Sequence, residues 1–404
     1  MDGPLSARNG ELCVALCVTG SIAAYKAAHV ARLLVKAGAR VLPVMTASAG
    51  HFLGPATLSG ITGEPVRTGM WDPSFAGEMH VAIAELADVV LVVPATADFL
   101  ARLAHGRADD LVAALALVAR GPVLVAPAMH PRMWLHPATK RNVETLGKDG
   151  RVEILGPASG LVANGDEGPG RMLEPDEIVA AVFAAVAPKD LVGKRVLVTA
   201  GPTVEDLDPV RFLGNRSTGR MGFAIAARAA ARGAEVVLVA GPVELASPPR
   251  VRRVDVRGAL QMRDAMNEAL ATGIDAVVMA AAVADYRPAE TSATKVKKQG
   301  EQASVALLRN PDLIADLGRA RKGQRPVLVA FALETGDHAH VIQEARRKLE
   351  QKHVDLVVAN EASSAFGRDD NEVTFVTASR EERLPRASKT ALADVLLDRI
   401  QSLL

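Results

Sequence analysis

The stretch that decides the fold is TAGPTVEDLDPVRFLGNRSTGRMGFAIA, which runs from Thr199 to Ala226. An apolar run, RVLV at 195–198, precedes it, and an alanine-rich helical pattern follows it. This order is typical of an open α/β sheet, in which loops at the carboxyl ends of the strands bind ligands. The loop holds more polar side chains than a connector needs, among them Asp208, Arg211 and Asn215. We therefore expect a binding site in this loop.

A second start of the same kind lies near the N-terminus, where CVALCVTGSIAAYKAAHVARLL at 13–34 reads as strand, glycine turn and helix. Backbone N–H groups and the helix dipole at such a turn can hold a phosphate. A purely structural turn is the alternative at Gly20, Ser21 and Ile22, because many turns between a strand and a helix contain Gly-Ser. Two strand–turn–helix segments of this kind predict two binding sites.

Length and composition limit the class of protein. The chain has 404 residues, of which 49% are hydrophobic and 23% charged, as in α/β proteins with two or three domains. The net charge of +1 gives no global field for nucleic acid or an anionic membrane. The sequence has no signal-peptide pattern and no uncharged apolar run of about 18 residues. We therefore expect a cytoplasmic protein without membrane or nucleic-acid partners, in which Cys13 and Cys17 are buried rather than disulfide-bonded.

The apolar runs predict two sheets that divide near residue 189. Upstream strands are expected at 12–19, 40–45, 89–94, 123–127 and 152–155, alternating with helical patterns. A polar, turn-forming stretch at 187–194 is expected to be the linker. Downstream, runs at 195–199, 234–239, 276–280, 327–331 and 356–359 restart the alternation, and 372–377 with 391–404 suggest a hairpin-like strand and a closing helix. This pattern predicts an α/β protein with two doubly wound domains and mainly parallel sheets.

Small and hydroxyl residues end the third predicted strand, at Pro94, Ala95 and Thr96. A flat ring could approach closely there, while capping of the next helix by Thr96 is an alternative that can also hold. The next strand leads to AMHPRMW at 128–134, which suits either a lid or subunit contact around an apolar ring or packing on the local core. The sequence therefore predicts a ligand edge with these two loops beside it.

Two further segments could carry chemistry in the upstream half. His80 stands in an otherwise apolar stretch, and a histidine suits proton transfer near neutral pH, although a structural histidine is the alternative. The segment GDEGPGRM at 165–172 is rich in glycine, which indicates either a mobile flap or a surface turn.

These motifs carry a resemblance to known families. GSIAAYK, MHVAIAELAD, PATAD, PAMHPRMW and GDEGPGRM make the upstream half similar to flavin-dependent cysteine decarboxylases. TAGPT, DPVRFLGNRSTGRMG, AAAVADY, KVKK, NPDL and KLEQKHVDLVVAN make the downstream half similar to phosphopantothenate cysteine ligases. Together they resemble the bifunctional coenzyme A biosynthesis family over nearly the whole chain. The resemblance implies a flavoprotein-type decarboxylase domain at 1–188 and a Rossmann-like ligase domain at 189–404.

For the ligase, the resemblance implies that CTP activates the carboxylate of 4′-phosphopantothenate as an acyl-cytidylate, from which the cysteine amine displaces CMP. Lys295 would contact the triphosphate, and Arg211 and Asn215 would bind the acyl-cytidylate and phosphopantothenate. Asp285 would serve the nucleotide or its Mg²⁺ or Mn²⁺ ion. The nucleotide side would consist of Ala281, Asp285, Pro311, Asp312, Leu313, Ile314, Phe331, Lys348 and Lys352.

Without the resemblance, each of these residues has a simpler interpretation. Lys295 could belong to a solvated charge run, Asn215 could be a turn residue, and Phe331 could be a core side chain at a strand end. The i,i+4 spacing of Lys348 and Lys352 places them on one helix face, which is also common on plain surface helices.

For the decarboxylase, the resemblance implies FMN as the cofactor and His80 as the catalytic histidine. The cysteinyl group of phosphopantothenoylcysteine would be oxidised to a thioaldehyde, carbon dioxide would leave, and the enethiol would be reduced to 4′-phosphopantetheine. The residues implied to bind FMN are Gly20, Ser21, Ile22, Thr46, Pro94, Ala95, Thr96 and Met133.

The sequence departs from the decarboxylase pattern at two positions. His130 replaces the asparagine that holds the substrate carboxylate, and Asn164 replaces the flap cysteine. Asparagine cannot donate a proton as a thiol can. We interpret the pair as a variant active site. The alternative is an active ligase with a flavin-binding upstream half that is non-catalytic or releases an oxidised enethiol.

A dinucleotide-dependent oxidoreductase is a further alternative, but neither glycine turn shows GxGxxG followed by an acidic residue about 20 positions on. With 3% aromatic residues, the chain offers few stacking platforms for nucleic acid. The expected partners are the small molecules 4′-phosphopantothenate, cysteine and CTP. Family members form decarboxylase trimers and ligase dimers, so the resemblance also implies a homo-oligomer, a dodecamer built from both contacts.

Overall fold

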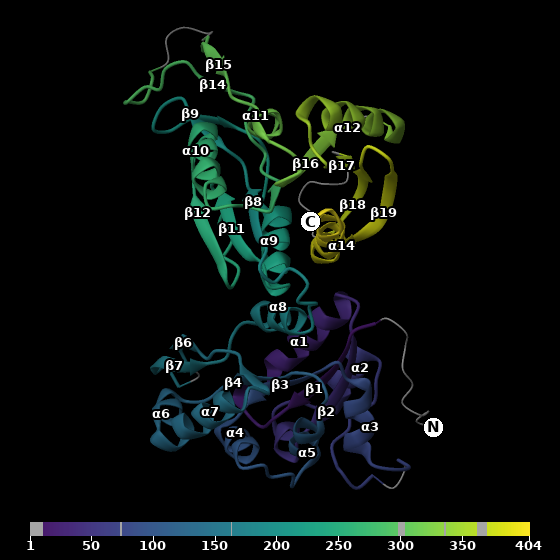
Figure 1. Ribbon diagram of the computed structural model, residues 1–404. Helices are drawn as coiled ribbons and strands as arrows, with labels where there is room; N and C mark the ends of the chain where they lie inside the picture. Colours follow the sequence, from purple (N-terminus) through teal and green to yellow (C-terminus); the bar gives the residue numbers. More distant parts are fainter. Residues whose placement is uncertain (1–10, 73–74, 163, 298–303, 335–336, 362–369) are drawn as a thin grey trace. The chain divides into compact units, whose positions relative to one another are not determined.

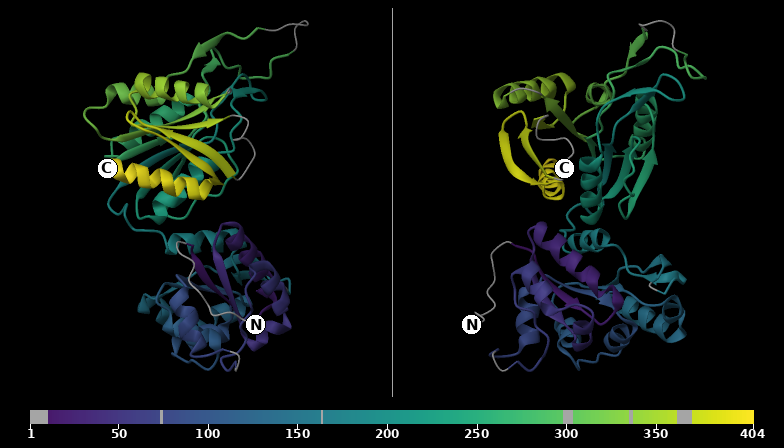
Figure 2. Two further views of the ribbon diagram at one scale, coloured as in Figure 1. Left: turned by 90° about the vertical axis from the view of Figure 1, so that its right-hand side faces the viewer. Right: turned by 180° about the vertical axis from the view of Figure 1, so that it is seen from behind.

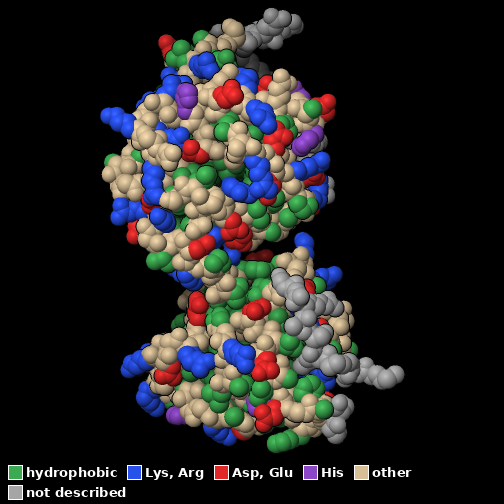
Figure 3. All heavy atoms as spheres, turned by 45° about the vertical axis from the view of Figure 1, so that its right-hand side comes forward, with side chains coloured by type: hydrophobic (Ala, Val, Ile, Leu, Met, Phe, Trp, Pro, Cys, Tyr) green, Lys and Arg blue, Asp and Glu red, His purple; other side chains and the backbone are tan. Residues whose placement is uncertain are grey.

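The computed structural model describes residues 11–72, 75–162, 164–297, 304–334, 337–361 and 370–404. The chain divides into two compact units, Met1–Val186 and Ala187–Leu404, which are described separately (Figure 1). Within the described residues, no helix is long and apolar enough to cross a membrane. On the face drawn in Figure 3, basic and acidic side chains are interspersed over both units.

Unit 1 contains a five-stranded parallel sheet in the order β2-β1-β3-β4-β5. The strands occupy every predicted position, and β1 and β3 are buried along their whole length, which explains their continuous apolar runs. Cys13 and Cys17 are buried in β1, as expected, and burial raises the pKa of the Cys13 thiol to about 11. The strands are β1 Cys13–Val18, β2 Arg40–Met45, β3 Val89–Ala95, β4 Val123–Pro127 and β5 Val152–Ile154.

Helices cover both faces of this sheet, so unit 1 is doubly wound as predicted. Val14 and Leu16 of β1 pack toward one helix layer, while Ala15 and Cys17 pack toward the other, because successive side chains of a strand alternate in direction. One layer holds α1 Tyr25–Lys36, α2 Pro55–Thr62 and α8 Pro175–Ala185. The other holds α3 Met79–Leu86, α4 Ala97–Ala104, α5 Leu111–Val118 and α7 Pro137–Asp149. Three short helices, η1 Ile22–Ala24, η2 Ala47–His51 and α6 Pro131–Leu135, follow strand ends.

The glycine-rich segment at 165–172 forms part of an antiparallel hairpin, made of β6 Ala158–Leu161 and β7 Glu167–Arg171. The surface-turn interpretation therefore holds only for Gly165 and Asp166, and the strand that follows was missed because glycine-rich strands lack the side-chain alternation by which strands are predicted. Gly170 has φ +141°, and a Cβ there would lie 2.3 Å from the carbonyl oxygen of Met129. The Met129 N–H donates to the Gly170 oxygen at 3.0 Å, so the hairpin is fixed against the loop after β4.

Unit 2 contains an eight-stranded sheet in the order β12-β11-β8-β13-β16-β17-β18-β19, antiparallel only from β17 onward. The prediction missed β12 and β19, because edge strands carry polar side chains that hide the apolar pattern. The strands are β8 Arg195–Ala200, β11 Glu235–Ala240, β12 Val251–Asp255, β13 Ala276–Met279, β16 Val327–Glu334, β17 Leu356–Glu361, β18 Asp370–Val376 and β19 Glu381–Ser388.

Helices also cover both faces of the second sheet (Figures 1 and 2). One layer holds α9 Arg220–Ala231 and α14 Lys389–Leu403, and the other holds α10 Ala259–Leu270, α11 Leu313–Ala320 and α12 His338–Lys352. The stretch at 187–194 is not a free linker, since Leu191 is buried in the core beneath α9. Asp190 pairs with Arg232 at the end of that helix, with Oδ2 to Nη2 at 2.5 Å.

Two short hairpin-like pairs leave the carboxyl edge of the second sheet: β9 Val204–Asp206 with β10 Phe212–Gly214, and β14 Tyr286–Pro288 with β15 Leu307–Arg309. Figure 2 shows β14 and β15 extending away from the sheet. The Ser292 N–H donates to the Leu207 oxygen at 3.0 Å, which ties the two pairs together. The loop that decides the fold is thereby held against the β14–β15 arm.

Candidate active sites

The carboxyl ends of the strands in unit 1 are tied to one another. The Thr46 N–H donates to the Val18 oxygen at 3.0 Å, which joins β2 to β1. The Thr19 hydroxyl donates to the Pro94 oxygen at 2.7 Å and accepts from the Thr96 N–H at 3.3 Å, which joins β1 to β3. The predicted Thr46, Pro94 and Thr96 therefore meet at one edge of the sheet.

Each turn at this edge begins a helix. The hydroxyls of Ser21, Thr46 and Thr96 cap η1, η2 and α4, respectively, so the capping interpretation of Thr96 is correct. The turns also lie close together, because a Cβ at Gly20 would lie 2.7 Å from the Cβ of Ser48. This close contact between the two turns requires glycine at position 20.

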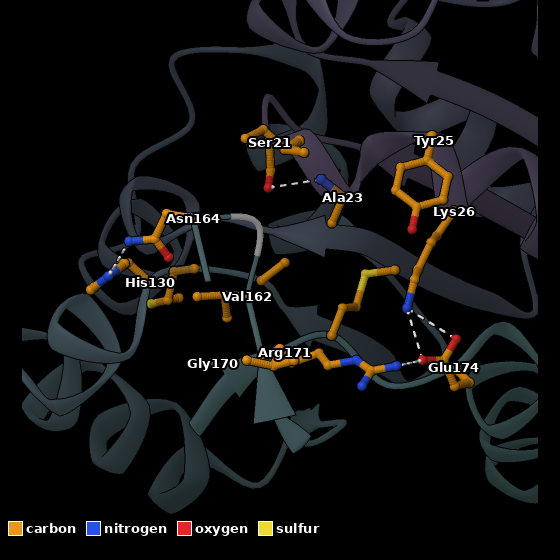
Figure 4. Close-up of a pocket in the computed structure, with 15 residues that line it drawn as sticks. Ser21, Ala23, Tyr25, Lys26, His130, Val162, Asn164, Gly170, Arg171 and Glu174 are labelled. Carbon is orange, nitrogen blue, oxygen red and sulfur yellow. Dashed lines mark hydrogen bonds and ion pairs between the residues drawn. The ribbon is translucent and has the colours of Figure 1, made fainter. Parts of the chain in front are cut away.

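A cavity of about 700 Å³ opens between the turn after β1, the loop after β4 and the β6–β7 hairpin (Figure 4). Four predicted site residues line it: Ser21, Ile22, His130 and Asn164. Its middle is largely apolar, with Met129 and Val162 among the lining residues. The structure thus brings the glycine turn and both departures from the family pattern into one cavity.

His130 is held through both of its ring nitrogens. Nδ1 accepts the Arg132 N–H at 3.2 Å, and Nε2 lies 2.7 Å from Oδ2 of Asp166. Because Nδ1 accepts, Nε2 carries the proton and donates it to the carboxylate. Asn164 joins the cluster, since its Oδ1 accepts the Asp166 N–H at 3.2 Å and its Nδ2 lies 3.2 Å from Nε2 of His130. The hydrogen bonds from His130 and from Asn164 hold the pKa of Asp166 below its ordinary value.

A charged cluster lines the other side of the cavity in Figure 4, where Lys26, Arg171 and Glu174 meet. Neither Asp166 nor any of these three residues was predicted as a site residue. Lys26, Asp166 and Arg171 lie inside the motifs GSIAAYK and GDEGPGRM, which were the signal that could have identified them.

Seven predicted residues do not line this cavity: Gly20, Thr46, His80, Pro94, Ala95, Thr96 and Met133. His80 lies in the first turn of α3, and its buried Nδ1 has no hydrogen-bond partner in the described part of the chain. Met133 is about half exposed on α6. Thr46 lines a separate depression with Trp71 and other residues. One copy of the chain therefore does not gather the whole set of predicted flavin residues.

In unit 2, a cavity of about 160 Å³ lies at the carboxyl ends of β13 and β16. Two of its lining residues, Lys352 and Asp312, form an ion pair, with Nζ to Oδ2 at 3.1 Å. The structure gathers in this cavity the predicted residues Ala281, Asp285, Pro311, Asp312, Leu313, Ile314, Phe331 and Lys352. Lys348, one turn earlier on α12, does not line it.

Asn310 fixes the shape of this cavity and was missed as a site residue. Its side-chain amide donates to the Ala284 oxygen at 2.8 Å, and its N–H donates to the Asp285 oxygen at 2.8 Å. These bonds join the loop after β13 to the turn before α11. The signal was present, because Asn310 begins the NPDL motif.

The remaining ligase candidates lie beside the cavity. Asn215 donates through Nδ2 to the oxygen of Val283, a lining residue, at 2.9 Å. Arg211 donates through Nε and Nη2 to Oδ2 of Asp208, at 3.0 and 2.6 Å. Lys295 is exposed on the arm next to Val296.

Asp208 connects Arg211 to the segment that carries Lys295. Its carboxylate is buried, with the residue 1% exposed, and it accepts the Val296 N–H at 3.2 Å and the Arg211 N–H at 2.9 Å. Arg211 in turn donates to the Val296 oxygen at 3.0 Å. The Arg211 guanidinium holds the pKa of Asp208 well below its usual range. A buried carboxylate therefore joins segments that are 88 residues apart.

Comparison with known proteins finds a family match for each half of the chain. Residues 3–187 match the family model "Flavoprotein", and residues 191–404 match "DNA/pantothenate metabolism flavoprotein C-terminal domain". The chain is 44% identical to the coenzyme A biosynthesis bifunctional protein CoaBC of Vibrio cholerae, over 95% of this chain and 96% of that protein. It is 47% identical to CoaBC of Mycolicibacterium smegmatis, over 96% of each.

Solved structures match each half. The C-terminal domain of CoaBC is 36% identical, with 53% of this chain and 97% of that chain covered and a TM-score of 0.45. The FMN binding protein AtHal3 is 30% identical, with 43% of this chain and 95% of that chain covered and a TM-score of 0.38. From the near full-length identity and the two family matches, we conclude that this chain belongs to the CoaBC family of bifunctional coenzyme A biosynthesis enzymes, which combine a phosphopantothenoylcysteine decarboxylase with a phosphopantothenate–cysteine ligase.

Proposed function

We propose that residues 189–404 condense 4′-phosphopantothenate with cysteine at the expense of CTP, and that residues 1–188 decarboxylate the product to 4′-phosphopantetheine with FMN. The observation that supports this division is the presence of two cavities, one in each unit, each lined by residues that the family resemblance assigns to one reaction. Each reaction would thus have its own site.

The residues of unit 1 fit FMN as the cofactor. The turn at Gly20 leaves no room for a Cβ, and capped helix starts at Ser21, Thr46 and Thr96 meet at the sheet edge, which suits a phosphate and a closely approaching ring. The unpartnered Nδ1 of His80 is a buried polar group that needs a partner from a ligand or a second chain. When bound, FMN supplies the two-electron oxidation and reduction that decarboxylation of the cysteinyl group requires.

We assign distinct tasks to His80, which lies outside the cavity of about 700 Å³, and to His130 and Asn164, which line it. His80 is the proton-transfer residue, because a desolvated nitrogen without an internal partner is available to a substrate. His130 is occupied by Arg132 and Asp166, so it holds the β6–β7 hairpin in place. Asn164 then remains as the amide donor for the substrate carboxylate, the task of the asparagine that His130 replaces.

In the ligase cavity, we assign Phe331 to the nucleotide base and Lys352 to the phosphate groups of CTP, with Lys348 contacting the nucleotide from outside the cavity. Lys295 would reach the triphosphate from the arm, and Arg211 and Asn215 would hold the phosphopantothenoyl part. Cations at these positions would stabilise the charge that develops on the phosphoryl oxygens.

The cation would be Mg²⁺ or Mn²⁺, held by the exposed carboxylate of Asp285. Mg²⁺ usually keeps several waters and binds one or two carboxylates together with substrate phosphates. A single carboxylate at the cavity fits an ion that arrives with CTP. No group of three or more histidine, cysteine or acidic side chains could hold a metal within the described ranges, which agrees with an ion bound mainly through the nucleotide.

We further propose that the chain forms decarboxylase trimers and ligase dimers, which together give a dodecamer. His80, Thr46 and Met133 lie outside the main cavity, so a second copy could complete the flavin site. Exposed apolar side chains at Ile22 and Met133 in unit 1 and on the arm of unit 2 would be covered in such contacts. A cytoplasmic enzyme is supported by two cysteines without a disulfide.

The test is turnover of the full chain under anaerobic conditions. With 4′-phosphopantothenate, cysteine, CTP and Mg²⁺, we expect release of CMP and pyrophosphate, and with phosphopantothenoylcysteine we expect carbon dioxide and 4′-phosphopantetheine by mass. His80→Asn should abolish decarboxylation and spare the ligase, whereas Lys295→Met should do the reverse, so each variant is the control of the other. A product two hydrogens lighter would show that reduction of the enethiol fails, and absence of carbon dioxide from wild-type protein would leave only the ligase.

A further inference from the structure

The charged cluster of the decarboxylase cavity consists of Lys26, Arg171 and Glu174. Lys26 Nζ lies 3.0 Å from Oε2 of Glu174, and Arg171 Nη2 lies 2.5 Å from Oε1 of the same residue. All three line the cavity, and they come from α1, the end of β7 and the N-cap of α8. Two cations thus converge on a single carboxylate.

The cluster keeps an excess of positive charge toward the cavity. Lys26 stands in the first turn of α1, where the helix dipole already favours anions, and its side chain is only 13% exposed. Arg171 and Glu174 are about half exposed, and ion pairs of that kind add little to folding stability. Packing alone therefore does not account for a desolvated lysine at this position.

Both cations retain donors after pairing with Glu174. A guanidinium has five N–H donors and an ammonium has three, of which the contacts to Glu174 use only part. The guanidinium also lies over Gly160, where a Cβ would come within 3.3 Å of Nη1. Ionic hydrogen bonds from Lys26 and Arg171 hold the pKa of Glu174 below its ordinary value, so Glu174 stays ionised.

We propose that Lys26 and Arg171 bind the terminal phosphate of phosphopantothenoylcysteine, with Glu174 holding the two cations in place. The inference rests on the proposed decarboxylase function. In Figure 4 the cluster lies on the opposite side of the cavity from His130 and Asn164, and apolar Val162 lies between them. This order matches the substrate, whose phosphate and cysteinyl group are at opposite ends of the pantothenoyl chain.

The test compares phosphopantothenoylcysteine with pantothenoylcysteine, which lacks the phosphate, in the full-length FMN-loaded protein. We expect wild-type protein to prefer the phosphorylated substrate, and Lys26→Met and Arg171→Met each to reduce kcat/KM for it by about 10- to 100-fold while changing kcat/KM for pantothenoylcysteine less than about threefold. Equal losses with both substrates would overturn the proposal.

Two further measurements distinguish the substrate phosphate from the cofactor phosphate, and the phosphate site from the decarboxylase function. If Lys26→Met releases FMN but leaves riboflavin binding unchanged, the cluster holds the cofactor phosphate and the proposal fails. If wild-type protein shows no decarboxylation, calorimetry with 4′-phosphopantetheine and pantetheine still decides: a preference for the phosphate that Lys26→Met removes upholds the phosphate site, and no such preference overturns it. Arg120→Met is the matched control, since Arg120 forms an exposed pair with Glu85 at 3.0 Å outside this cavity.

Discussion

At the scale of single residues, Asp208 organises a site from distant parts of the chain. Its buried carboxylate accepts hydrogen bonds from the backbone and guanidinium of Arg211 and from the backbone of Val296, next to Lys295. Within the described residues, none of its hydrogen bonds is to a lining residue of the ligase cavity, so it would act by positioning Arg211 and Lys295. A positioning role predicts a loss of ligase activity without a loss of fold.

Asp208→Asn keeps the shape of the side chain and removes the charge that binds Arg211. We expect kcat/KM of the ligase to fall by about 10- to 100-fold, as for loss of a charge-assisted hydrogen bond, while decarboxylation of supplied phosphopantothenoylcysteine stays unchanged. Asp206→Asn is the control, because Asp206 pairs with Arg257 at 2.6 Å on an exposed part of the same loop. Equal effects of both substitutions would contradict a specific role for Asp208.

The lowered pKa of Asp208 also predicts how its pair with Arg211, and therefore the ligase rate, depends on pH. A carboxylate whose pKa is lowered by folding stabilises the fold at pH values above its ordinary pKa of 3.8, and this contribution disappears only as the pH falls through the lowered value. The pair with Arg211 should therefore stay intact between about pH 8 and pH 5. We expect the wild-type to Asp208→Asn ratio of ligase rates to be constant over that range, and a ratio that declines toward pH 5 would be inconsistent with this assignment.

In unit 1, Asp166 has a similar positioning role, which it exerts through its hydrogen bond with His130. Asp166→Asn should reduce decarboxylation by about tenfold, because the neutral amide is a weaker acceptor for the Nε2 proton. In a His130→Asn background, the same substitution should have little further effect, which a double-mutant cycle of kcat/KM measures. Additive losses would mean that Asp166 acts independently of His130.

At the scale of elements, the β6–β7 hairpin depends on a glycine that the sequence pattern alone did not explain. Gly170→Ala would force a Cβ against the Met129 oxygen, at 2.3 Å, in a backbone conformation that favours glycine. We expect the hairpin to shift and decarboxylation to fall by more than about 100-fold, because two lining segments would separate. The ligase rate of the same protein should be retained.

Gly147→Ala is the matched glycine control. Gly147 lies inside α7, and no atom lies within 4 Å of a Cβ built there. Alanine should raise the stability of unit 1 by about 0.5–1 kcal/mol without changing either activity. Thermal unfolding and both rates check this contrast, and comparable decarboxylation losses at Gly147 and Gly170 would disprove the steric argument.

At the scale of the whole molecule, the two units have separate cores, and each can be destabilised separately. Arg232 is 1% exposed and pairs with Asp190 at 2.5 Å and with Asp398 at 2.7 Å, which joins the start of unit 2 to α14. Arg232→Met would leave two carboxylates without their cation. We expect the free energy of unfolding of unit 2 to fall by about 2–3 kcal/mol, less than for a fully buried pair, because both carboxylates reach solvent.

Fluorescence can separate the units, because both tryptophans, Trp71 and Trp134, lie in unit 1. In denaturant, the Arg232→Met transition should move to lower concentration by circular dichroism and stay unchanged by tryptophan fluorescence. Arg263→Met, which removes an exposed pair with Asp264, is the control and should move neither signal. A shift of the fluorescence transition would show that the units unfold together.

The sequence by itself determined both sheets, because their buried strands carry continuous apolar runs and their ligand loops carry recognisable motifs. The family resemblance assigned Ser21, His130 and Asn164 to the decarboxylase site and Asp285, Asp312 and Lys352 to the nucleotide site, and the structure gathers each set in one cavity. Only the tertiary structure decided the polar edge strands β12 and β19 and the glycine-rich hairpin, since these segments form through backbone pairing that leaves no apolar pattern. It also decided which partners Lys26, Asp166, Asp208 and Asn310 meet, because a polar side chain has its effect through the group it contacts in space, and those partners are distant in sequence.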